Sequence, residues 1–106
     1  MVKRGEVWLA ALDPTVGGDI RKTRPCLVVS PPDMHDHLGT VLAAPMTTGS
    51  RPAGFRVPVK FQGKDGSILL DQVRALDKQR LVRRLDALAP TTLRASLAVL
   101  RETFAE

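Results

Sequence analysis

The 106-residue sequence has a single cysteine, Cys26, no tyrosine, and only 4% aromatic residues. One cysteine cannot form a disulfide within the chain, and its place in an apolar run favours a small buried core residue. The low aromatic content argues against an adaptor for proline-rich peptides, because such domains bind their ligands in aromatic-lined grooves.

Common ligand-binding motifs are also missing. The sequence contains no G-x-x-x-x-G-K-[ST], G-x-G-x-x-G, H-E-x-x-H or C-x-x-C, so nucleoside triphosphates, dinucleotides and structural zinc are unsupported as ligands. His35 and His37 have the spacing of metal ligands, but two ligands in a polar loop are too few. We expect no metal and no cofactor.

No apolar run approaches the ~20 residues of a membrane span, and Met1–Glu6 does not open a secretory signal. We therefore expect a cytoplasmic protein with no membrane partner. A length of 106 residues predicts a single domain over residues 1–106. A domain of this size buries roughly 60–68% of its unfolded surface, so a groove or an interface is a more natural site than a deep cavity.

What the sequence does have is positive charge. It contains 16 Lys and Arg against 11 Asp and Glu, a formal net charge of +5. A basic surface favours a polyanionic partner such as nucleic acid. Charge alone leaves open a basic protein that has no such partner.

Short apolar runs separated by Gly and Pro predict antiparallel strands. The segment Arg56–Phe61 alternates between apolar and polar residues, and Pro58 has no N–H to donate, so this strand is expected at an edge. The expected strands are Glu6–Leu12, Pro25–Ser30, Thr40–Pro45, Arg56–Phe61, Ser67–Leu76 with a break near Asp71-Gln72, and Leu81–Leu88.

Turns and a final helix complete the predicted fold. A helical turn is expected at Pro31–Asp33 and a tight turn at Gly63–Gly66. A helix beginning at Pro90 carries an apolar stripe that packs on the sheet or on a partner. The stripe consists of Leu93, Leu97, Leu100 and Phe104. Together these elements favour a mainly β fold with a C-terminal helix, a small SH3-like barrel of antiparallel strands.

Polar residues gather at the predicted strand ends and in the flanking loops. If the second and third strands pair as antiparallel neighbours, Arg24 lies beside Thr47. An arginine fork with threonine hydroxyls would form a phosphate cradle. The alternative is that Thr47 and Thr48 cap a turn at Gly49. The polar candidates are Asp19, Arg21, Lys22, Arg24, Thr47, Thr48, Ser50, Arg51, Asp71 and Gln72.

Three segments resemble the MazF/PemK family of toxin endoribonucleases. KRGEVWLAALDPTVGGDIRKTRPCLVVSP (residues 3–31) is similar to the family's opening, APMTTG (44–49) to its P-x-T-T segment, and LLDQVRALDKQRL (69–81) to its D-Q-(V/I)-(R/K) strand. The resemblance implies an SH3-like barrel, a homodimer, and neutralisation by an acidic MazE-like antitoxin. It also implies sequence-specific, metal-independent cleavage of single-stranded mRNA by 2′-OH attack, which leaves 2′,3′-cyclic phosphate and 5′-OH ends.

Residue roles follow from the same resemblance, position by position. Arg24 and Thr47 match the family's main catalytic pair, and Asp19 lies where many members have a glutamate. Leu69 stands where the PemK-like branch has a catalytic arginine, which places the chain closer to the MazF branch. The remaining polar candidates are expected to contact RNA: Arg21, Lys22, Thr48, Ser50, Arg51, Asp71 and Gln72.

A second hypothesis is a toxin that has the same barrel fold but no ribonuclease activity. The toxin CcdB has the same architecture, binds DNA gyrase and cleaves nothing; its binding residues lie on the terminal helix, with a Trp-Gly near its end. This chain has its one tryptophan at Trp8 and ends in Arg101–Glu106, which argues against a gyrase-binding toxin.

Overall fold

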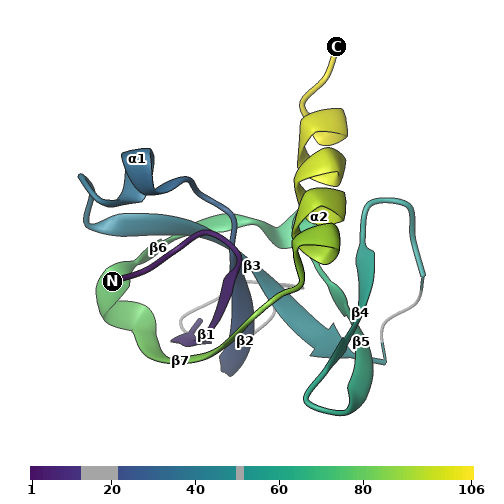
Figure 1. Cartoon of the computed structure of the whole chain (residues 1–106), viewed down its shortest axis with the longest axis horizontal. Coiled ribbons are helices and arrows are strands. Elements are labelled where there is room, and N and C mark those ends of the chain that lie inside the picture. The colour runs from purple at the N-terminus through teal and green to yellow at the C-terminus, as the bar shows by residue number, and fades with distance from the viewer. Residues whose placement is uncertain (13–21, 50–51) are drawn as a thin grey trace.

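The computed structural model describes residues 1–12, 22–49 and 52–106, which form mainly antiparallel strands followed by a C-terminal helix (Figure 1). This arrangement confirms the predicted fold class. In chain order the elements are β1 (Glu6–Ala11), β2 (Thr23–Val28), α1 (Pro32–His35), β3 (Thr40–Thr48), β4 (Val57–Phe61), β5 (Lys64–Ile68), the 3-10 helix η1 (Leu70–Gln72), β6 (Arg74–Asp77), the 3-10 helix η2 (Lys78–Arg80), β7 (Leu81–Ala87) and α2 (Pro90–Thr103).

Strand β3 organises the sheet. The strand order is β4-β5-β3-β2-β1-β7, and β6 lies beside the first part of β3. Residues 40–43 of β3 pair with β6, residues 43–45 with β2, and residues 46–48 with β5. A strand that passes from one set of neighbours to another lets the twisted sheet curl into a half-barrel. The prediction ended this strand at Pro45, but pairing with β5 extends it to Thr48.

The main apolar core lies between the curled sheet and α2, whose places in the fold can be followed in Figure 1. Three of the four predicted stripe residues, Leu93, Leu97 and Leu100, pack against it. The fourth, Phe104, is 75% exposed because it follows the last helical turn. The buried members of the core are Val7, Leu27, Val29, Ala44, Met46, Val57, Ile68 and Leu70. In the described segments, no helix has the length and apolar character of a membrane span.

The opposite face of the sheet carries a smaller apolar cluster that includes Cys26 and Val41. Cys26 and Leu27 are neighbours in β2 yet belong to different clusters, because successive side chains of a strand point to opposite faces. Burial raises the pKa of the Cys26 thiol to about 12, although the charge of Arg74 opposes this. The thiol therefore stays protonated and unreactive, and the predicted core role of Cys26 is confirmed.

The hairpin of β4 and β5 differs from the prediction in one respect. Strand β4 is an edge strand, as Pro58 predicted. The expected turn at Gly63–Gly66 is wrong, because β5 already begins at Lys64. Gln62 and Gly63 have φ angles of 50° and 79°, the left-handed backbone of a two-residue hairpin turn. The shorter turn moves Lys64 from a loop into a paired strand.

Candidate active site

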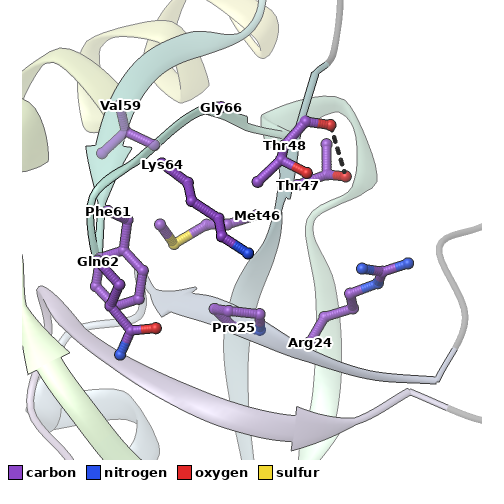
Figure 2. Close-up of a pocket in the computed structure, with 10 residues that line it drawn as sticks. All are labelled: Arg24, Pro25, Met46, Thr47, Thr48, Val59, Phe61, Gln62, Lys64 and Gly66. Atoms are coloured by element: carbon purple, nitrogen blue, oxygen red, sulfur yellow. Dashed lines mark hydrogen bonds between the residues drawn. The ribbon is translucent and has the colours of Figure 1, made fainter.

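The pairing of β2 with β3 brings Arg24 next to Thr47. The paired residues are Cys26 with Pro45, Leu27 with Ala44, and Val28 with Ala43. Arg24 and Thr47 each lie two residues beyond the last of these pairs, Cys26 with Pro45, at the same end of the paired stretch. Both side chains line one hollow of about 260 Å³ (Figure 2). The structure therefore brings together the two residues that the sequence singled out.

Two kinds of side chain surround this hollow, which we call the Arg24 hollow. Its polar lining consists of Arg24, Thr47, Thr48, Gln62 and Lys64. Its apolar lining consists of Pro25, Met46, Val59 and Phe61, and Gly66 completes the wall. No carboxylate lies among these lining residues of the described chain. A hollow with cations, hydroxyls and an apolar wall suits a ligand that carries both negative charge and a flat apolar part.

Arg24 is held at the entry of β2 and is only partly exposed. Pro25 follows it and stiffens the backbone at this point. The Nε of Arg24 is buried and has no hydrogen-bond partner among the described residues. A buried donor without a partner costs about 1–3 kcal/mol, more for a charged group. A bound anion that accepted this hydrogen bond would recover that free energy.

Thr47 and Thr48 lie at the end of β3, where β5 approaches closely. Thr48 pairs with Gly66, and a Cβ on Gly66 would come within 2.0 Å of the Thr47 carbonyl oxygen. Only glycine fits at this contact. The Thr47 hydroxyl donates to the Thr48 carbonyl oxygen at 3.4 Å (Figure 2). Both threonines therefore belong to a paired strand beside Arg24, rather than capping a turn.

The sequence did not point to the β4–β5 hairpin, which supplies five residues of the lining: Val59, Phe61, Gln62, Lys64 and Gly66. The alternation of Arg56–Phe61 placed Val59 and Phe61 on one face but gave no sign that this face borders Arg24. The two-residue turn was the missing signal. Recognising Gln62-Gly63 as the turn would have put Lys64 into a strand beside Phe61.

The other predicted residues lie away from the hollow or outside the described chain. Lys22 is exposed just before β2, and its carbonyl oxygen accepts a hydrogen bond of 2.9 Å from the Leu12 N–H. Leu69, the position of the PemK-branch arginine, is buried in the core. Four predicted residues fall in 13–21 or 50–51 and so lie outside the described residues: Asp19, Arg21, Ser50 and Arg51.

Asp71 and Gln72 lie on η1 and do not line the Arg24 hollow. Asp71 accepts two hydrogen bonds of 3.0 Å from Arg56, one from Nε and one from Nη2. These bonds lower the pKa of Asp71 below its ordinary value, against a smaller opposing effect of burial. The Gln72 amide oxygen accepts from Arg74 Nη2 at 3.4 Å. The RNA-binding roles predicted for Asp71 and Gln72 stay predictions.

One histidine of the H-x-H pair, His35, has a structural role, while His37 is exposed. The fully buried His35 ring lies 2.8 Å from the Ser30 hydroxyl at Nδ1 and 2.9 Å from the Val2 carbonyl oxygen at Nε2. Ser30 also accepts from the Leu42 N–H at 3.1 Å, so its hydroxyl hydrogen is available to Nδ1, and Nε2 carries the ring proton. Within residues 1–12, 22–49 and 52–106, no three metal-ligating side chains gather.

Comparisons of sequence and of structure with known proteins identify the same family. A family model described as "PemK-like, MazF-like toxin of type II toxin-antitoxin system" matches residues 3–104. Endoribonuclease PemK of Escherichia coli is 36% identical over 98 residues, which cover 87% of this chain and 74% of that protein. Endoribonuclease MazF of Staphylococcus epidermidis is 32% identical over 99 residues, covering 88% and 82%. The crystal structure of MazF (Form-I) from Deinococcus radiodurans has a TM-score of 0.85 at 25% identity, covering 96% of this chain and 94% of that one.

Proposed function

The chain belongs to the family of PemK-like, MazF-like toxins of type II toxin–antitoxin systems, and we propose that it cuts single-stranded RNA at the Arg24 hollow without a metal ion. It is an endoribonuclease, as its relatives PemK and MazF are named. The observation that carries the location of the site is the Nε of Arg24, which is buried beside Thr47 and has no hydrogen-bond partner in the part of the chain that the structure describes. No finding favours the gyrase-binding alternative.

RNA supplies its own nucleophile, which limits what the protein must do. The ribose 2′-oxygen attacks the adjacent phosphorus and loses its proton to a base. A 2′-O–P bond forms, the P–O5′ bond breaks, and the leaving 5′-oxygen takes up a proton from the surrounding water. The products are a 2′,3′-cyclic phosphate and a 5′-OH. The protein contributes charge stabilisation and proton transfer, and the reaction needs no bound water as nucleophile.

Each site residue then has a role. Arg24 donates to the phosphate oxygens, where negative charge grows during the reaction. The Thr47 hydroxyl holds a non-bridging oxygen, and Asp19 acts as the base that takes the 2′-OH proton. The remaining predicted contacts, including Lys22 and Thr48, attract and orient the RNA strand.

The proposal also covers the antitoxin, the oligomeric state and the cellular compartment. Membership of a toxin–antitoxin family supports a cognate antitoxin, which we expect to be acidic because the toxin carries a net charge of +5. We also propose that the active form is a homodimer, that residues 1–106 form one toxin domain, and that it works in the cytoplasm, where mRNA is found.

A direct test is incubation of the purified protein with a long RNA in EDTA, followed by chemical analysis of the new ends. We expect cleavage that leaves 2′,3′-cyclic phosphate and 5′-OH ends. A substrate with 2′-deoxyribose at the cut should resist, because its nucleophile is missing. A requirement for Mg²⁺, or 5′-phosphate ends, would contradict the mechanism.

A further inference from the structure

A second cation reaches into the Arg24 hollow. The ammonium group of Lys64 extends from β5 toward the centre of the hollow, between the apolar wall and Arg24 (Figure 2). Lys64 is exposed and has no hydrogen-bond or ion-pair partner within the described segments. No acidic side chain belongs to the lining that the structure describes, so within it two like charges face one space and repel each other. An anion bound between them would convert this repulsion into attraction.

The hairpin geometry explains why Lys64 faces inward. The two-residue turn at Gln62-Gly63 pairs Phe61 with Lys64 and Lys60 with Asp65. Directly paired residues of an antiparallel hairpin share a face, so Lys64 lies on the same face as Phe61, and Lys60 lies on the other. Lys60 carries the same charge on the same hairpin but does not line the hollow.

Phe61 adds an aromatic, apolar surface to the hollow. Its half-buried ring lies beside Met46 and forms part of an apolar wall that faces the Lys64 ammonium (Figure 2). Aromatic side chains in clefts that bind single-stranded nucleic acid stack on bases, which present a flat apolar face. A phosphate site and an apolar wall in one hollow match the two halves of a nucleotide.

We propose that the β4–β5 hairpin completes the substrate site: Lys64 binds the phosphate at the cut together with Arg24, and Phe61 contacts the base of a nucleotide that flanks the cut. This inference rests on the proposed ribonuclease function and adds the hairpin to it. It assigns a substrate-binding role to two residues that family resemblance and motif spacing left out.

The proposed binding of the phosphate by Lys64 is tested with Lys64→Gln and its matched control Lys60→Gln, both measured on one RNA substrate. Each variant removes one positive charge, so both lose the same long-range attraction. We expect Lys64→Gln to lower kcat/KM about 10- to 100-fold, as for a lost hydrogen bond to a charged group. Lys60→Gln should stay within about 3-fold of wild type, since a screened surface charge contributes little, and Lys64→Arg should retain most activity.

The proposed contact between Phe61 and a nucleobase is tested with Phe61→Leu and its control Phe55→Leu. The substrates vary the nucleobase on either side of the cut. Phe55 is 51% exposed and lies outside the hollow. We expect Phe61→Leu to change the ratio of rates among the four bases at one flanking position, and Phe55→Leu to leave it unchanged. A folding defect would lower all rates equally, so unchanged ratios in Phe61→Leu would overturn the base contact.

The outcomes separate this inference from the proposed function. If wild type cuts RNA and Lys64→Gln behaves like Lys60→Gln, the hairpin inference is wrong while the proposed function stands. If wild type cuts no RNA in EDTA, the proposed function itself is wrong and the inference falls with it.

Discussion

At the scale of single residues, two features of Arg24 lower the stability of the protein when no ligand is bound. Its Nε is buried without a partner in the described chain, and its charge shares a hollow with that of Lys64. Residues that lower the stability of the empty protein in this way are typical of sites built for a ligand. The ligand that relieves both costs is an anion with oxygens at hydrogen-bond distance.

Replacing Arg24 by alanine should therefore slow cleavage much more than it weakens binding. We expect the single-turnover rate to fall by roughly 10²–10³-fold, as for the loss of one preorganised donor. Binding should weaken less, because the other cations still attract the RNA backbone. The control is Arg94→Ala, an exposed arginine of α2 that does not line the hollow. Equal losses in the two variants would show that Arg24 contributes only general charge.

Gly66 sets the position of Thr47 through its lack of a side chain. In Gly66→Ala the new Cβ would meet the Thr47 carbonyl oxygen at 2.0 Å, so β3 and β5 must separate. We expect a loss of about 1–3 kcal/mol in the free energy of unfolding and reduced cleavage by the folded fraction. Gly39→Ala is the control, since open space surrounds Gly39. Urea denaturation of both variants measures the difference, and equal stabilities would refute the close contact.

At the scale of elements, a buried carboxylate joins β1 to β7. Glu6 Oε1 accepts from the Lys3 N–H at 2.8 Å and from Trp8 Nε1 at 3.1 Å, and Oε2 accepts from Arg84 Nε at 2.8 Å. Burial alone would raise the pKa of Glu6, but these hydrogen bonds and the charge of Arg84 outweigh it and lower the pKa below 4.5. The ionised form thus holds the chain start and the β7 edge strand to β1.

This pairing predicts how stability depends on acidity. Because the folded-state pKa of Glu6 is depressed, its contribution is complete above the ordinary value of 4.5 and is lost as pH falls through the lower folded value. Glu6→Gln should cost about 1.5–3 kcal/mol at pH 7. The variant should also lose less stability than wild type between pH 5 and 3, as measured by urea denaturation. Parallel pH profiles for the two proteins would contradict this account.

The elements also show what the sequence could and could not predict. Proline at position 58 correctly predicted an edge strand, because a missing N–H is a local property. The nearness of Arg24 and Thr47 followed from one assumption about which strands pair. The inward position of Lys64 was missed, since it depends on the turn at Gln62-Gly63, which is two residues shorter than the expected turn. A small change in turn length alters which residues face each other across a hairpin.

For the whole molecule, α2 leaves apolar surface uncovered. Leu97 and Leu100 are only partly buried against the core, and Phe104 is 75% exposed. A second copy of the chain could cover this surface through a symmetric interface. We expect light scattering to find a dimer at micromolar concentration. A monomer under these conditions would contradict the proposed homodimer without affecting the site in the Arg24 hollow.

The central claim is that the protein acts by cutting RNA at the Arg24 hollow, and the most direct test is the growth of cells that express Arg24→Ala without antitoxin, read beside the variant's cleavage rate. The account predicts that growth arrest and RNA cleavage are lost together, while wild type retains both. If Arg24→Ala no longer cuts RNA but still arrests growth, ribonuclease activity is not how this protein acts.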